Sequence, residues 1–255
     1  MSGFVEALKY FTALFQIKTN YLRYIRAVFL YRLKRKAEFP RAFLNLEGAK
    51  FVTRENSMDI AHLSSLYERE TTRLLMDMKP KIFIDIGAHV GRFSIILAKK
   101  GSKVISVEPS KSNFNQLNKN IKLNSLQDSI IALNVGCSDK KGKETLYFVS
   151  QNEGLSSLEK KDNATKETIM VKRLDEICRE LKLSPESISV IKADVEGFEL
   201  NVLKGAARIL RESSPILVIE ITDKGRERKI REFLDKFGFS CKKVLDFRNF
   251  IFSKR

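Results

Sequence analysis

The sequence predicts an α/β fold in which a mostly parallel sheet is covered by helices on both faces. From residue 81 onward, short apolar segments alternate with stretches of about ten residues in which apolar side chains recur at helical spacing. The first apolar segment, FIDI at 83–86, runs directly into a turn that contains glycine, as a strand of a parallel sheet does before its helix. A chain of 255 residues is long enough to bury the core of such a domain.

The first 60 residues differ from the rest, and we expect them to form a basic, aromatic-rich helical extension and linker. Apolar side chains recur at helical spacing through residues 1–36, which predicts two amphipathic helices. Residues 37–60 show weak periodicity, which indicates a loop with short strands. Helical spacing resumes over 61–78. We therefore divide the chain into an extension at 1–60 and a main domain at 61–255.

The main domain alternates strands and helices in a regular order. Strands are predicted at 81–87, 103–109, 129–136, 189–195 and 215–221, with further extended segments at 144–150 and 168–174. Helices are predicted at 92–100, 113–123, 174–183, 199–211 and 227–237. The last two extended segments, 241–247 and 250–255, predict a closing hairpin. Because parallel strands need crossover connections, these helices should cover both faces of the sheet.

Composition limits the class of protein. A hydrophobic content of 43% and a charged content of 31% are ordinary for a soluble globular domain. No apolar run reaches the ~20 residues of a membrane span, and the N-terminal segment carries Glu6 and Lys9 inside its apolar pattern, unlike a signal peptide. Three widely spaced cysteines and two histidines predict neither a disulfide framework nor a metal site. These features predict a cytoplasmic protein.

The basic charge lies mainly at the two ends of the chain. Net charge is +16, with ten basic against three acidic residues in 1–50 and fourteen against seven in 201–255. Such asymmetry favours anionic partners, although solubility alone also explains it. Residues 1–36 combine eight basic with eight aromatic residues, which suits peripheral attachment to an anionic membrane surface. Packing on the main domain, packing on a second copy in a homo-oligomer, and binding of nucleic acid are the alternatives.

The turn after the first strand narrows the choice of ligand. Its pattern, Asp85-x-Gly87-x-x-x-Gly91, is neither the G-x-G-x-x-G of dinucleotide-binding folds nor the G-x-x-x-x-G-K-[ST] of phosphate loops. Glu108 closes the next strand 23 positions after Asp85, near the spacing at which an acid binds ribose hydroxyls. An acid before the turn repels phosphate and attracts a cation, so the pattern favours S-adenosylmethionine, which has a ribose, a sulfonium and an ammonium group. The alternative is that Asp85 caps the next helix and that the glycines only form the turn.

Longer stretches of the chain resemble a known family, the FkbM-type methyltransferases. These are S-adenosylmethionine-dependent enzymes with a Rossmann-like fold of the class I methyltransferase type. The resemblance covers about residues 64–222 and departs from the family pattern at His89, where Gly-Ala-Asn is usual. It is carried by FIDIGAHVGRFSIILAKKG, VISVEPSKSNFNQLNKNIKLN, GLSSL, VKRLDEI and IKADVEGFELNVLKGA.

The resemblance implies roles for residues in and around the turn. It implies that the turn surrounds the methionine part of the cofactor, that Glu108 binds the ribose, and that the residues after the third strand approach the adenine. Glu70, in an acidic segment that matches one in the family, is implied to meet the ammonium group, with a solvated helix face as the alternative. The cofactor-binding residues implied in this way are Glu70, Asp85, Gly87, Ala88, His89, Gly91, Glu108, Ser138 and Asp139.

Asp194 and Glu196 are the candidates for chemistry, because they follow the apolar strand VIKA at the sheet edge where acceptor and cofactor should meet. A carboxylate there can orient the acceptor oxygen and accept its proton. Capping of the following helix explains the same residues equally well. The predicted function is methylation by S-adenosylmethionine of a hydroxyl on a sugar, lipid-linked glycan or small metabolite. The alternatives are an RNA methyltransferase and a non-catalytic binding protein on the same fold.

Overall fold

A computed structural model describes residues 39–149, 156–157 and 164–255, so the helices predicted in 1–36 lie outside the described residues. The main sheet has the strand order β12-β13-β11-β10-β3-β4-β5. Its strands are β3 (Ile82–Ile86), β4 (Lys103–Val107), β5 (Ile130–Leu133), β10 (Val190–Ala193), β11 (Ile216–Glu220), β12 (Phe239–Leu245) and β13 (Asn249–Lys254). The five strands from β11 to β5 run parallel, and the hairpin β12–β13 closes the sheet in antiparallel pairing. The predicted mostly parallel sheet with a closing hairpin is confirmed.

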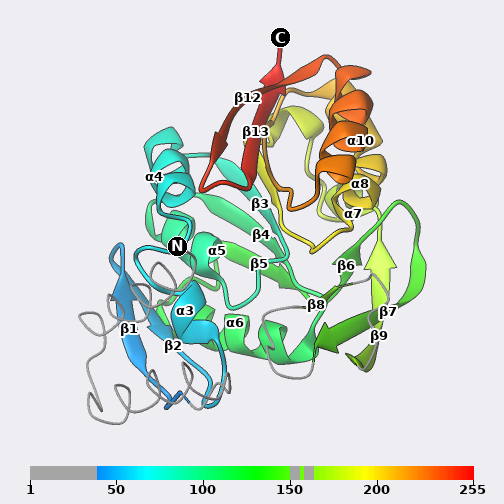
Figure 1. Cartoon of the computed structure of the whole chain (residues 1–255). Helices are drawn as coiled ribbons and strands as arrows, with labels where there is room; N and C mark the ends of the chain where they lie inside the picture. The colour runs from blue at the N-terminus through cyan, green and yellow to red at the C-terminus, as the bar shows by residue number, and fades with distance from the viewer. Residues whose placement is uncertain (1–38, 150–155, 158–163) are drawn as a thin grey trace.

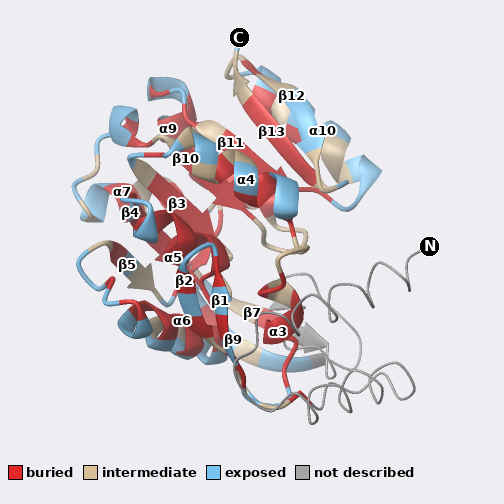
Figure 2. Cartoon of the chain, turned by 90° about the vertical axis from the view of Figure 1, so that its left-hand side faces the viewer, coloured by how far each residue is buried: buried red, intermediate tan, exposed pale blue. Residues whose placement is uncertain are grey.

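Helices cover both faces of this sheet (Figure 1). They are α4 (Arg69–Met78), α5 (Arg92–Lys99), α6 (Lys111–Leu123), α7 (Leu174–Glu180), α8 (Glu199–Gly205), α9 (Ala207–Glu212) and α10 (Lys224–Asp235), with a short α3 (Asp59–His62) and a 3₁₀ turn η1 (Pro185–Ser187). The sheet divides the core in two, because successive side chains of a strand point to opposite faces. On β3, Phe83 packs with α5 and α6 on one side, and Ile84 packs with α7 to α10 on the other. Figure 2 shows the buried strands between helices whose outer faces are exposed.

The helix predicted over 61–78 is divided, and the reason is Arg92. The chain turns between α3 and α4, and Glu68 has a φ of +43° immediately before α4 begins. The Arg92 guanidinium is 5% exposed and donates to the carbonyl oxygens of His62 and Ser64 at 2.9 Å each and to that of Tyr67 at 2.6 Å. The Ser64 carbonyl also accepts from the Tyr67 N–H at 3.0 Å, which is a turn bond and not an α-helical one. The guanidinium thus binds carbonyls that are not part of a continuous helical hydrogen-bond ladder.

The strand predicted over 129–136 is also divided. β5 ends at Leu133, where the Asn134 amide donates to the carbonyl oxygens of Glu108 and Pro109 at 2.9 Å each. The chain then enters a second, four-stranded sheet of order β6-β9-β7-β8. This sheet contains β6 (Gly136–Cys137), β7 (Gly142–Val149), β8 (Ser156–Ser157) and β9 (Ala164–Lys172). The two extended segments predicted at 144–150 and 168–174 therefore pair with each other outside the main sheet.

Residues 39–60 belong to the main core, which corrects the boundary that we expected after residue 60. They form an antiparallel hairpin of β1 (Phe43–Leu46) and β2 (Ala49–Val52), and the buried Phe51 packs in the same cluster as α5 and α6. On α6, the Asn120 and Asn124 side chains each accept at 2.9 Å from a backbone N–H of β2. These bonds satisfy one edge of the hairpin, so the hairpin and α6 fold as one unit.

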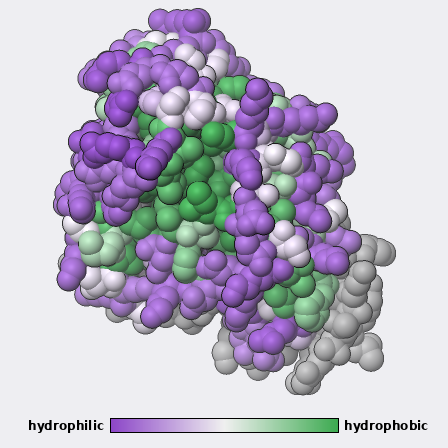
Figure 3. Space-filling model, turned by 180° about the vertical axis from the view of Figure 1, so that it is seen from behind, coloured by the Kyte–Doolittle hydropathy of each residue, from purple (hydrophilic) through white to green (hydrophobic). Residues whose placement is uncertain are grey.

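The face opposite that of Figure 1 has hydrophobic side chains gathered in the middle of a mostly hydrophilic surface (Figure 3). Patches of this kind are typical of contacts with partners. The patch does not identify its partner, so the homo-oligomer stays a prediction. Within the described ranges, no helix combines the length and the apolar character that crossing a membrane requires.

Candidate active site

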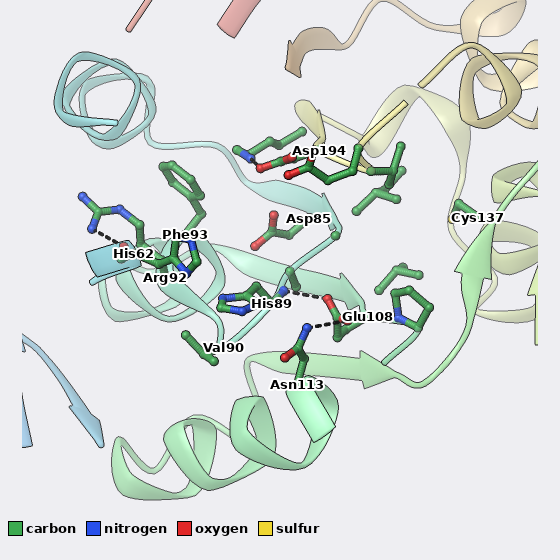
Figure 4. A pocket seen from close by; sticks show the side chains of 18 of the residues that line it. His62, Asp85, His89, Val90, Arg92, Phe93, Glu108, Asn113, Cys137 and Asp194 are labelled. Atoms are coloured by element: carbon green, nitrogen blue, oxygen red, sulfur yellow. Dashed lines mark hydrogen bonds and ion pairs between the residues drawn. The ribbon is translucent and has the colours of Figure 1, made fainter. Parts of the chain in front are cut away.

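A cavity of about 230 Å³ opens at the carboxyl ends of β3, β4 and β10 (Figure 4). Carboxyl ends of parallel strands lie at one edge of a sheet, so residues more than 100 positions apart in sequence meet there. The predicted site residues that line the cavity are Asp85, Gly87, Ala88, His89, Glu108, Asp194 and Glu196. The fold thus brings both candidates for chemistry to the same space as the glycine-containing turn.

Four of the predicted residues do not line the cavity. Gly91 begins α5 behind the turn, with a φ of +92°. Glu70 points away, and one of its oxygens lies 3.4 Å from the backbone N–H of Asp246, which donates to it. The buried Ser138 hydroxyl donates to Asp139 at 3.1 Å. The acid of the YERE segment that lines the cavity is Glu68, two residues before Glu70.

The turn after β3 packs directly against the end of β10. Gly87 has a φ of +81°, and a Cβ built there would lie 1.8 Å from the carbonyl oxygen of Asp194. The N–H groups of Gly87 and Ala88 donate to the carbonyl of Val107 at 2.9 and 3.1 Å. Glycine at this position therefore allows the turn to contact both neighbouring strands, and this contact sets where Asp194 lies.

Glu108 is a buried carboxylate at one end of the cavity. It accepts from the backbone N–H groups of His89 at 2.8 Å and Ser110 at 3.0 Å and from the Asn113 amide at 3.2 Å. Burial raises its pKa to about 7, although these hydrogen bonds act in the opposite direction. Within the described part of the chain, the buried Oδ1 of Asn113 has no hydrogen-bond partner. This end of the cavity therefore presents acceptors for the hydroxyl groups of a ligand.

Asp85 has a structural partner as well as a place in the cavity wall. One of its oxygens accepts from the backbone N–H of Ser94 at 3.1 Å and from the Ser94 hydroxyl at 2.6 Å. Ser94 lies in the first turn of α5, so Asp85 satisfies one of the free N–H groups at the start of that helix. The architectural explanation that the sequence left open accounts for these contacts.

The opposite end of the cavity borders a cluster of five ionisable side chains, four of which line it. Lys192 is 2% exposed, and its Nζ lies 3.1 Å from Asp194 and 3.9 Å from Glu68. Arg248 lies 2.9 Å from Glu220 and 3.4 Å from Glu68. One oxygen from each of the three acids lies within 4.8 Å of the others. We call these five residues the charged cluster.

The charged cluster holds Asp194 as a carboxylate. Burial raises the pKa of Asp194, but the charge of Lys192 and a hydrogen bond from Glu220 outweigh it, so the net pKa lies below its usual range. Burial and the charge of Asp194 raise the pKa of Glu220 well above its usual range. Of the two carboxyl groups, this environment favours the charged form of Asp194 and the protonated form of Glu220. Asp194 is a stable anion and a weak base, because the cluster favours its charged form.

A neutral aromatic wall lies between the two ends. The rings of His62 and His89 meet edge to face with centroids 4.8 Å apart, and Tyr67 packs on His62 at 5.2 Å. Burial lowers the pKa of His62 to about 3 and that of His89 to about 4, so both rings are neutral at pH 7. The Lys192 ammonium lies 4.9 Å from the centre of the Phe93 ring. This wall can contact a ligand without adding charge to the cavity.

The sequence analysis missed four members of the charged cluster: Glu68, Lys192, Glu220 and Arg248. A signal existed for Lys192, because a lysine inside the apolar strand VIKA must find an acidic partner if the strand is buried. Glu220 ends the apolar strand ILVIE and gave a weaker signal of the same kind. Nothing in the sequence indicated that Arg248 reaches the cavity.

The chain is similar to several known methyltransferases. The methyltransferase sdnD of Sordaria araneosa is 28% identical over 187 residues, which cover 61% of this chain and 72% of that protein. The hexuronic acid methyltransferase AglP of Haloferax volcanii is 27% identical over 156 residues, which cover 60% of this chain and 62% of that protein. A crystal structure of a methyltransferase FkbM from Methylobacillus flagellatus KT aligns with 69% of this chain and 43% of that chain, at 18% identity and a TM-score of 0.49.

One protein family accounts for most of the chain. The family described as "Methyltransferase FkbM domain" matches residues 85–241, from the Asp85 turn to the first strand of the closing hairpin. This range is more than half of the 255 residues and includes Glu108 and Asp194. The chain therefore belongs to the FkbM methyltransferase family.

Proposed function

We propose that this methyltransferase uses S-adenosylmethionine to methylate a hydroxyl group, and that the hydroxyl belongs to a sugar. The observation that carries the proposal is that Glu108 and Asp194 face one cavity from β4 and β10, the two strands that flank β3. One acid is placed to hold a cofactor and the other to hold an acceptor, on either side of the turn that separates them.

The residues at the Glu108 end fit S-adenosylmethionine. Ribose hydroxyls are hydrogen-bond donors, and Glu108 together with the unpartnered Oδ1 of Asn113 supplies buried acceptors for them. Three basic residues line the cavity. Lys192 and Arg248 pair with acids of the charged cluster, and Arg92 donates to backbone carbonyls, so these residues do not favour a phosphate-bearing cofactor. When bound, the cofactor supplies an electrophilic methyl group on sulfur.

The residues at the other end suit an acceptor hydroxyl. Asp194 remains ionised, so it can accept a hydrogen bond from the hydroxyl and orient its oxygen. Orientation alone can lower a barrier by ~7–11 kcal/mol. Because Asp194 is a weak base, we assign it this orienting role first. Once the hydroxyl oxygen had gained the methyl group and sulfur had lost it, the oxygen would be strongly acidic and would pass its proton to the Asp194 carboxylate. A sugar is the proposed acceptor class because its hydroxyls need such orientation and because the relative AglP is named for a hexuronic acid.

The proposal is tested in two steps. S-adenosylhomocysteine should raise the thermal unfolding temperature of the full chain, whereas NAD and ATP at equal concentration should not, because a ligand that binds only the native state stabilises it. Labelled methyl from S-adenosylmethionine should then enter saccharides in preference to lipid or RNA fractions of a cell extract. Stabilisation by NAD instead, or label found only in RNA, would contradict the proposal.

Glu108 should make cofactor binding depend on pH near neutrality. Ribose hydroxyls bind the ionised carboxylate more strongly than the protonated one, so affinity for S-adenosylhomocysteine should increase as pH rises through about 7. Glu108→Ala should cost ~1.5–3 kcal/mol of binding free energy at pH 8. Isothermal titration calorimetry between pH 6 and 8 measures both effects, and Glu108→Gln, which cannot ionise, should remove the pH dependence. A variant with wild-type affinity and wild-type pH dependence would refute the assignment.

The same carboxyl should affect the ligand-free protein in the opposite direction. Its folded pKa is raised, so its contribution to stability is fully present below its ordinary value of 4.5 and is lost as pH rises through about 7. Ligand-free wild type should therefore lose more stability than Glu108→Gln as pH increases from 5 to 8.

A further inference from the structure

Phe247, in the turn that precedes Arg248, has a backbone conformation that is strained for a bulky residue. Phe247 lies in the turn between β12 and β13, and its side chain is 102% exposed. Asp246 and Phe247 have φ values of +48° and +67°, and the Arg248 N–H donates across the turn to the carbonyl of Leu245 at 3.1 Å. Turns with two such residues favour Asn-Gly or Asp-Gly, because a bulky side chain is strained at positive φ. The backbone at Phe247 is thus strained at a position where glycine would be more stable. The phenyl ring is exposed, so its burial does not offset this strain.

The turn is fixed in place beside the cavity. The Asp246 carboxylate accepts from the backbone N–H groups of Glu70 at 3.2 Å and Thr71 at 2.8 Å, in the first turn of α4. On the other side of Phe247, Arg248 lines the cavity and joins the charged cluster. Glu220 at the end of β11 pairs with Asn249, so the turn lies at the carboxyl edge of the sheet, as the cavity does (Figure 1). Phe247 is therefore next in sequence to a residue that lines the cavity, in a turn at the same edge of the sheet.

We propose that Phe247 is the outer wall of the acceptor site, on which a sugar ring of the acceptor stacks with its C–H face. This inference rests on the proposed function and adds a residue that determines acceptor binding. Asp194 would hold one hydroxyl inside the cavity, and the rest of a saccharide would extend out of it. Phe247 is the exposed aromatic residue next in sequence to Arg248, which lines the cavity. Aromatic side chains supply contact area to ligands at low cost in conformational entropy, because they have only two rotatable angles.

The proposal makes stability and acceptor binding change in opposite directions. Phe247→Gly should raise the unfolding temperature by roughly 2–4 °C, because it relieves the strain of positive φ and loses no buried contact. It should also raise KM for the saccharide about tenfold, with kcat and affinity for S-adenosylhomocysteine unchanged. Val244→Ala is the matched control: it removes an apolar side chain, 43% exposed, from the same hairpin and should leave KM unchanged. Wild-type KM in Phe247→Gly would overturn the proposal.

Contact between residue 247 and the saccharide can be measured by fluorescence, because the chain contains no tryptophan. Phe247→Trp introduces a single fluorophore at this position, and an oligosaccharide ending in a hexuronic acid should change its emission saturably in the presence of S-adenosylhomocysteine. A change only with vesicles that contain phosphatidylserine would assign the ring to a membrane and overturn the proposal. No change with the oligosaccharide, in protein that S-adenosylhomocysteine still stabilises, would overturn it while the cofactor assignment stands. Lack of that stabilisation in the wild type would instead refute the proposed function.

Discussion

Asparagine in place of Asp194 is expected to lower methyl-transfer turnover by ~10²-fold or more while changing affinity for S-adenosylhomocysteine little. The amide keeps the shape of the side chain and can still accept from Lys192, 3.1 Å away in the wild type, but it loses the charge that orients the acceptor hydroxyl. Cofactor affinity should be preserved because Glu108 lies at the other end of the cavity. The substitution therefore separates an orienting role from a purely structural one.

Stability should change little in the same variant, for a reason that lies in the charged cluster. Burial and the charge of Asp194 beside it raise the pKa of Glu220, which favours its protonated form. When that charge is removed, Glu220 can ionise against Arg248, 2.9 Å away, and the net charge of the cluster is restored. A buried ion pair that loses one partner ordinarily costs ~3–5 kcal/mol. Here we expect only a fraction of that, because a second acid replaces the first.

Single-turnover rates, calorimetry and thermal unfolding of Asp194→Asn measure these three quantities. Asp235→Asn, the same substitution on the exposed face of α10, is the matched control and should behave as wild type. The folded pKa of Asp194 is depressed, so the stability that its charge contributes is present above its ordinary value of 3.8 and lost as pH falls through the lower, folded value. Turnover should accordingly not decrease between pH 8 and 5 through Asp194. Unchanged turnover in Asp194→Asn would exclude the orienting role.

The mostly parallel character of the main sheet and the place of the site could be predicted from sequence, because both depend on local patterns. Apolar strands followed by helical spacing fix parallel neighbours, and the rule that ligands bind at the carboxyl ends of such strands brings Glu108 and Asp194 together. Positive φ at Gly87 is likewise a local requirement of the turn. These features do not depend on which distant side chain becomes a partner.

The charged cluster could not be predicted in this way, because its members come from four separate segments. Glu68 precedes α4, Lys192 lies in β10, Glu220 ends β11 and Arg248 ends the turn before the last strand. Their contacts therefore follow from tertiary packing. Glu70 was predicted to face the cofactor, but Glu68 lines the cavity, and this difference also depends on tertiary packing. The Arg92 guanidinium turns the chain between α3 and α4 and so decides which acid faces the cavity.

The second sheet and the β1–β2 hairpin were missed as parts of the domain because short strands with weak periodicity do not specify a partner. Asn120 and Asn124 on α6 accept hydrogen bonds from the backbone of β2. The sequence pattern within residues 39–60 does not predict that side chains of a distant helix are its hydrogen-bond partners. Asn134, at which the predicted strand 129–136 is divided, also binds a distant backbone group, because its amide donates to the carbonyl of Glu108 after β4.

Alanine in place of Gly87 is expected to lower activity strongly and to destabilise the protein by roughly 3–5 kcal/mol. Two costs add. A non-glycine residue at a φ of +81° is strained by ~1–2 kcal/mol, and the new Cβ would lie 1.8 Å from the Asp194 carbonyl, a contact that only backbone movement can relieve. Because that movement displaces the residue that orients the acceptor, turnover should decrease by at least ~10²-fold.

Gly101→Ala separates these two costs. Gly101 has a φ of +101° in the turn between α5 and β4, but a Cβ there would meet nothing within 4 Å. Gly101→Ala should therefore have only the cost of backbone strain, with an unfolding temperature lower by a few degrees and wild-type turnover. Thermal unfolding and initial rates of the two variants, side by side, measure the difference that the contact with β10 makes. If Gly87→Ala matched Gly101→Ala in both, the contact between the turn and the end of β10 would not be what positions Asp194, and the orienting role would need another support.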